Sequence, residues 1–83
     1  MSRSLSKAHE ESIEKLVREV FRLGEQTPVA DLSAKSFAAW DSLRQVELGI
    51  RVQERFAVQL STSELLKLTS VQELKRILAE HLS

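Results

Sequence analysis

The sequence predicts an all-α fold, a small bundle of three main helices plus one short helix. Three segments repeat apolar residues at intervals of three and four, which places those residues on one face of a helix. No stretch shows the alternating pattern of a strand or a hairpin turn pair. One proline and two glycines are too few for a disordered or low-complexity chain. A single domain over residues 1–83 with one small hydrophobic core is therefore expected.

The first helix is expected at about residues 7–23, with Gly24 as its C-terminal cap. Its apolar stripe has amphipathic spacing and consists of Ile13, Leu16, Val17, Val20 and Phe21. From Gly24 to Trp40 the helical pattern lapses, which predicts a long loop. Leu32, Phe37 and Trp40 are expected to pin this loop to the core.

The second helix is expected at about residues 42–56, because Asp41 or Ser42 can act as its N-cap and no proline interrupts the segment. It carries two apolar stripes on nearly opposite sides, Leu43, Val46 and Ile50 on one and Leu48, Val52 and Phe56 on the other. Only one of these stripes can be buried in so small a protein. Gly49, inside this helix, either admits a close neighbour or is a tolerated imperfection that costs roughly 1 kcal/mol relative to alanine.

The two remaining helices are expected at about residues 63–67 and 71–81. The last one is well marked, because Ser70-Val71-Gln72-Glu73 reads as a capping box at its start. Apolar residues then recur at helical spacing, namely Val71, Leu74, Ile77 and Leu78.

Composition excludes several classes of function. Twelve basic residues balance twelve acidic ones, which argues against nucleic-acid binding. The chain has no cysteine, no apolar leader and no apolar run that could span a membrane, so a cytoplasmic protein is expected. His9 and His81 lack any metal-binding or catalytic-triad spacing, so we expect neither a metal site nor an enzyme.

One run of eight residues is informative about function. Residues 41–48 read Asp41-Ser42-Leu43-Arg44-Gln45-Val46-Glu47-Leu48. This run resembles the acyl carrier protein family, whose D-S-L-x-x-V-E-L signature it matches at every fixed position, and the order of helices and loop matches over nearly the whole chain.

The resemblance implies a carrier function. Ser42, next to Asp41, would bear a 4'-phosphopantetheine group transferred from coenzyme A by a phosphopantetheinyl transferase. The thiol of that group would hold acyl or aminoacyl cargo as thioesters for acyl-loading and acyl-processing enzymes. A free-standing monomer is expected, and a fatty acyl, polyketide, peptidyl, aminoacyl or D-alanyl cargo all remain open. The simpler alternative is that Asp41 and Ser42 only cap the second helix.

The resemblance also favours one assignment of the two stripes, with the one that contains Leu48 facing the core, while the rival assignment, with the stripes exchanged, stays open. The exposed side would then bind partners, with Leu43, Arg44, Val46, Glu47, Ile50 and Arg51 as its candidate residues. Typical family members are strongly acidic along this helix, whereas this chain has Arg44, Arg51 and Arg55. These arginines lie next to Glu47 and Glu54, and the departure argues against recognition by the general fatty acid synthesis enzymes, whose docking surfaces are usually basic. It favours a specialised pathway. An unmodified helical interaction module is the alternative function.

Overall fold

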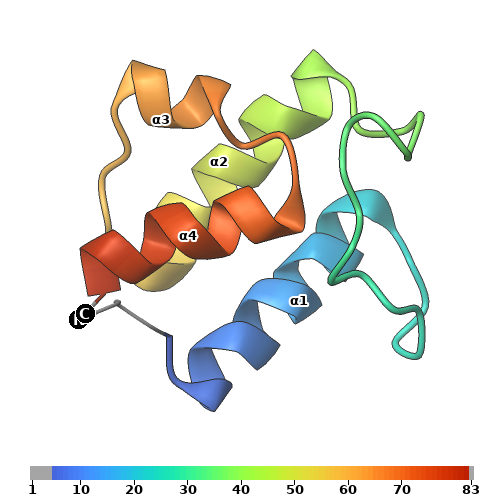
Figure 1. Cartoon of the computed structure of the whole chain (residues 1–83), viewed down its shortest axis with the longest axis horizontal. Coiled ribbons are helices and arrows are strands. Elements are labelled where there is room, and N and C mark those ends of the chain that lie inside the picture. Colours follow the sequence, from blue (N-terminus) through green and yellow to red (C-terminus); the bar gives the residue numbers. More distant parts are fainter. Residues whose placement is uncertain (1–4, 83) are drawn as a thin grey trace.

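The computed structural model describes residues 5–82 and contains four helices (Figure 1). They are α1 (Lys7–Phe21), α2 (Ser42–Phe56), α3 (Thr62–Leu66) and α4 (Val71–Leu82). The described residues form no strand, only an isolated bridge between Ser33 and Ser70. The expected all-α bundle with one short helix is confirmed.

The first helix, α1, starts where expected but ends earlier. The Ser6 hydroxyl accepts a hydrogen bond from the His9 backbone N–H at 3.1 Å and so caps the N-terminus. At the other end the left-handed residue is Arg22 (φ 56°), and the Leu23 N–H donates to the Arg18 carbonyl at 2.8 Å. The expectation of a helix to residue 23 capped by Gly24 is therefore wrong. Leu23 leaves the helix and packs against the core instead.

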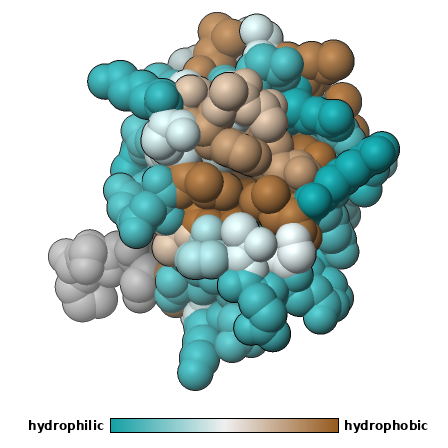
Figure 2. Space-filling model, turned by 90° about the vertical axis from the view of Figure 1, so that its right-hand side faces the viewer, coloured by the Kyte–Doolittle hydropathy of each residue, from teal (hydrophilic) through white to brown (hydrophobic). Residues whose placement is uncertain are grey.

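Residues 22–41 form the long loop, which covers one side of the bundle (Figure 1). Phe37 and Leu32 pack against the core, and Trp40 is buried within it, as expected. Val29 is a further anchor, since none of its surface is exposed. Figure 2 shows this face of the molecule, with apolar atoms across its middle and polar side chains around them.

Backbone hydrogen bonds join the loop to the start of α4. The Ala34 N–H donates to the Thr69 carbonyl at 2.8 Å, and the Val71 N–H donates to the Leu32 carbonyl at 3.0 Å. The loop is thus held by polar contacts as well as by its apolar anchors.

The short helix α3 begins one residue before its expected start. Ser61 and Glu64 form a complete capping box there, in which each side chain accepts the other residue's backbone N–H. At the start of α4 only half of the expected box forms. The Ser70 hydroxyl accepts the Glu73 N–H at 3.0 Å, while the Glu73 carboxylate pairs with Arg76.

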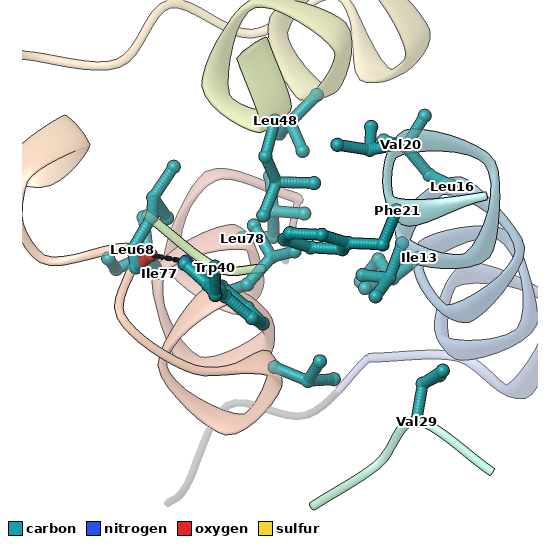
Figure 3. Packing of buried hydrophobic residues seen from close by; sticks show 14 of the residues in the cluster. Ile13, Leu16, Val20, Phe21, Val29, Trp40, Leu48, Leu68, Ile77 and Leu78 are labelled. Carbon is teal, nitrogen blue, oxygen red and sulfur yellow. Dashed lines mark hydrogen bonds between the residues drawn. The ribbon is translucent and has the colours of Figure 1, made fainter. Parts of the chain in front are cut away.

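The long helices and the loop share one buried cluster (Figure 3). Ile13 and Leu16 of α1 lie opposite Leu78 of α4, with Leu48 of α2 completing this centre. Among residues 5–82, no helix is long and apolar enough to cross a membrane.

Candidate functional site

The sequence left open whether Asp41 or Ser42 is the N-cap of α2, and the structure decides between them. Asp41 has an extended backbone, and its Oδ1 accepts a hydrogen bond from the Arg44 N–H at 2.9 Å. Asp41 is therefore the N-cap, and Ser42 is the first residue of the helix. Capping does not require the Ser42 hydroxyl.

Ser42 is exposed, and none of the described residues forms a hydrogen bond with its hydroxyl. The hydroxyl stands at the amino end of a helix of 15 residues, where the backbone dipoles produce a partial positive charge. A phosphate joined to this oxygen would be exposed to solvent and stabilised by that charge. The residues present therefore fit a phosphodiester-linked prosthetic group.

Trp40 fixes the position of this serine. Trp40 is 3% exposed, and its ring lies 5.0 Å from the Phe21 ring, measured between centroids. The indole Nε1–H donates to the Leu68 carbonyl at 3.1 Å, the dashed line in Figure 3. Because Trp40 is only two residues before Ser42, the core holds the exposed hydroxyl in a defined place.

An apolar surface begins at the next residue. Leu43, Val46 and Ile50 are 74%, 54% and 51% exposed, whereas Leu48 and Val52 are fully buried. The expected assignment of the two stripes of α2 is therefore confirmed, although Phe56 is half-buried and packs at the edge of the core. We call Leu43, Val46 and Ile50 the apolar strip.

Charged residues border the apolar strip. Glu47 accepts from Arg44, with Nη1 2.8 Å from Oε1, and also pairs with Arg51, whose Nη2 is 3.7 Å from Oε2. We call Arg44, Glu47 and Arg51 the charge ridge. Arg55, which the sequence suggested as part of the same stripe, instead pairs with Glu19 of α1 at 3.0 Å.

Sequence reasoning missed two residues next to this surface. Leu66 of α3 is 71% exposed, and Gln45 of α2 donates through Nε2 to the Leu65 and Leu66 carbonyls at 3.0 and 3.1 Å. The sequence contains one signal for Leu66, the adjacent pair Leu65-Leu66. Because neighbouring residues of a helix point about 100° apart, a short surface helix buries only one of them well. Gly49 does admit a close neighbour, since a Cβ there would overlap the Leu65 side chain.

The histidines have other partners. His9 lies edge-on to the Phe56 ring, and His81 Nε2 is 2.9 Å from Glu64 Oε2. The hydrogen bond from the Ser61 N–H and then that from His81 hold the pKa of Glu64 below its ordinary value. Within residues 5–82, no group of three or more potential ligands could hold a metal ion.

Comparison with known families agrees with this geometry. The family model described as "phosphopantetheine attachment site" matches residues 11–78, which include α2, α3 and the connecting loops. A search of curated proteins gave no match. Members of the matched family carry a 4'-phosphopantetheine prosthetic group and are typically carriers without catalytic activity of their own. The chain belongs to the phosphopantetheine-attachment-site family, as a carrier protein of the acyl carrier protein type.

Proposed function

We propose that the chain carries 4'-phosphopantetheine on the Ser42 hydroxyl and presents acyl or aminoacyl cargo to the enzymes of a specialised biosynthetic pathway. The observation that carries this proposal is the exposed Ser42 hydroxyl, which has no hydrogen-bond partner among the described residues and follows the capping residue Asp41. When bound, the group supplies the thiol on which cargo is held as a thioester, a function that a chain without cysteine cannot provide by itself.

The residues around Ser42 have separate tasks in this proposal. Asp41 starts the helix and Trp40 anchors it, so that the hydroxyl oxygen stays accessible to a transferase. The apolar strip begins beside the serine and provides a surface of the kind that binds partners. The arginines of the charge ridge support a pathway whose enzymes present acidic docking surfaces.

The test is modification by a promiscuous phosphopantetheinyl transferase in the presence of coenzyme A, followed by intact mass measurement. In this transfer the Ser42 oxygen loses its proton and forms a phosphodiester, while the pyrophosphate bond of coenzyme A breaks and adenosine 3',5'-bisphosphate leaves. We expect the wild type to gain the mass of one phosphopantetheinyl group and Ser42→Ala to gain none, because the variant lacks the acceptor oxygen. Ser63→Ala is the matched control, since Ser63 is another exposed serine close to a helix start. It should be modified like the wild type.

Two results would contradict the proposal. A modified Ser42→Ala protein would move the attachment to another residue. An unmodified wild type would favour the helical interaction module, which binds partners through the apolar strip without a prosthetic group.

A further inference from the structure

The first turn of α2 differs from that of the other helices. An acidic side chain lies in the first turn of α1, of α3 and of α4, namely Glu10, Glu64 and Glu73. In α2 the first turn has no acidic residue and contains Arg44 instead. The amino end of a helix has a partial positive charge, so a carboxylate is favourable there and a guanidinium is not. Arg44 is therefore at the end of α2 where its charge is least favourable.

The charges of α2 are balanced in number but not in order. The helix and its cap residue hold three arginines and three carboxylates, the latter being Asp41, Glu47 and Glu54. Glu47 is shared, since its Oε1 lies 2.8 Å from Nη1 of Arg44 and its Oε2 lies 3.7 Å from Nη2 of Arg51. Glu54 follows Arg51 by three residues, so Arg51 has a carboxylate on either side of it along the helix. Glu47 therefore keeps a second arginine if Arg44 leaves it.

Arg44 occupies the position from which a side chain reaches back to the cap of its helix. Side chains of a helix tilt toward its N-terminus, and the third residue of a helix is the one whose side chain closes a capping box. The same chain shows this reach in α3, where Oε1 of Glu64 accepts the Ser61 N–H at 2.9 Å. Arg44 stands equally far along the chain from its own cap, Asp41, and its side chain is longer and 39% exposed. Its guanidinium therefore reaches groups at the start of α2, where the Ser42 hydroxyl is exposed.

We propose that Arg44 is the counter-ion of the phosphodiester on Ser42, and that its guanidinium turns from Glu47 to that phosphodiester when the serine is modified. This inference rests on the proposed function, since it needs an anionic group on the Ser42 oxygen. A phosphate at a helix start beside an arginine gains charge-assisted hydrogen bonds. Glu47 keeps Arg51, so the exchange leaves no carboxylate of the charge ridge without a partner.

The exchange links modification to stability. A phosphodiester on Ser42 places a negative charge at the one helix start whose first turn lacks an acidic residue. The carboxylate of Asp41 repels that charge, and the Arg44 guanidinium offsets the repulsion. The modified chain is therefore more stable than the unmodified chain, and Arg44 is the residue on which the difference depends.

The test compares the unmodified and the modified full chain by urea denaturation followed with circular dichroism. The modified form is made with the promiscuous transferase and coenzyme A, checked by intact mass, and its terminal thiol is blocked with iodoacetamide. At the same urea concentration, we expect the unfolding equilibrium constant of the modified wild type to be about three- to tenfold smaller than that of the unmodified one. In Arg44→Gln the two forms should differ by less than about twofold, because the repulsion from Asp41 then cancels most of the contribution of the helix start. The wild-type difference should also shrink as salt screens the charges.

Arg55→Gln is the matched control. Arg55 is another arginine of α2 with an ion-pair partner, Glu19 of α1 at 3.0 Å, and it lies about three turns of helix away from Arg44. This substitution removes the same charge from the helix without affecting Glu47, so both forms should lose stability equally and the difference between them should remain. Glu47→Gln should increase the difference, because Arg44 then has no carboxylate to leave.

Different results overturn different parts of the proposal. A wild type that stays unmodified by intact mass overturns the proposed function and this inference with it. A modified wild type that is no more stable than the unmodified one overturns the inference alone. A difference that persists in Arg44→Gln, or that is lost equally in Arg55→Gln, overturns the role of Arg44 as the counter-ion. A smaller difference in Glu47→Gln than in the wild type contradicts the exchange of partners.

Discussion

At the scale of single residues, Asp41 caps α2 and the Ser42 hydroxyl takes no part in capping. An aspartate and a serine are both good N-caps, so their sequence order alone does not say which one accepts the backbone N–H. The extended backbone at Asp41 and its hydrogen bond to Arg44 give the cap to the aspartate. The serine hydroxyl then has no structural task, which is what a site of covalent modification needs.

This division predicts unequal effects on stability. Asp41→Ala should lower the free energy of unfolding by about 1 kcal/mol, because the Arg44 N–H loses its partner, whereas Asp41→Asn should retain most of the cap. Ser42→Ala should have little effect. Chemical denaturation of the three unmodified variants measures these differences, and a larger loss for Ser42→Ala than for Asp41→Ala would return the cap to the serine.

The limits of sequence reasoning are also clearest for single residues. The run from Asp41 to Leu48 makes Ser42 the candidate attachment residue only through its resemblance to the signature of the acyl carrier protein family. The pair Leu65-Leu66 indicates that one leucine of α3 is exposed, but which one it is, and which groups Gln45 contacts, depend on where α3 packs. The helix ends with Arg22, not Gly24, in the left-handed conformation, although that conformation costs a residue with a side chain about 1 to 2 kcal/mol. The hydrogen bond from the Leu23 N–H and the packing of Leu23 against the core compensate for this cost.

At the scale of elements, one apolar face of α2 is buried in the core and the other is exposed to solvent. The periodicity predicted both stripes, and the size of the protein required one of them to remain outside. Which stripe was buried followed only from the resemblance, because both are equally apolar. The structure places the stripe that contains Leu48 against α1 and α4.

Two leucines of α2 provide a matched test of this assignment. Leu48 is 0% exposed and Leu43 is 74% exposed, yet both are leucines of the same helix. Leu48→Ala should lower the free energy of unfolding by about 2 to 5 kcal/mol, since it leaves a cavity in the core, whereas Leu43→Ala should change it by less than about 1 kcal/mol. Urea denaturation measures both, and the reverse order would mean that the faces are exchanged.

The short helix α3 depends on Glu64, which closes its capping box and contacts His81. Because the pKa of Glu64 is lower in the folded chain than its ordinary value of 4.5, its carboxylate stabilises the fold most above about pH 4.5. That contribution is lost as the pH falls through the folded-state pKa.

We therefore expect Glu64→Ala to lower the free energy of unfolding by about 1 kcal/mol at neutral pH. The difference from the wild type should be smaller at an acidic pH below the folded-state pKa, because the wild-type carboxylate is then protonated in both states. Glu11→Ala, at an exposed position of α1, is the control and should show a smaller effect at neutral pH. A difference that is the same at both pH values would show that the charge of Glu64 is not what stabilises α3.

At the scale of the whole molecule, the loop of residues 22–41 does more than connect α1 to α2. The sequence predicted its length and its anchors Leu32, Phe37 and Trp40, because apolar residues in a polar segment need a place to be buried. It did not predict the hydrogen bonds between the loop and Leu68, Thr69 and Val71, which join residues 28 to 39 positions apart and leave no local pattern. Through these bonds the loop, α2 and α4 hold Ser42 in one place.

The Trp40 hydrogen bond is the part of this framework that one substitution can test. Trp40→Phe keeps an aromatic ring but leaves the buried Leu68 carbonyl without its donor and opens space beside Phe21. The free energy of unfolding should fall by about 1 to 3 kcal/mol. Because Trp40 is the only tryptophan, unfolding of wild type and variant must be compared by circular dichroism. Phe37→Leu, which keeps an apolar side chain at a half-buried anchor of the same loop, is the control and should have a smaller effect. A Trp40→Phe variant as stable as the wild type would show that the indole bond does not hold the start of α2.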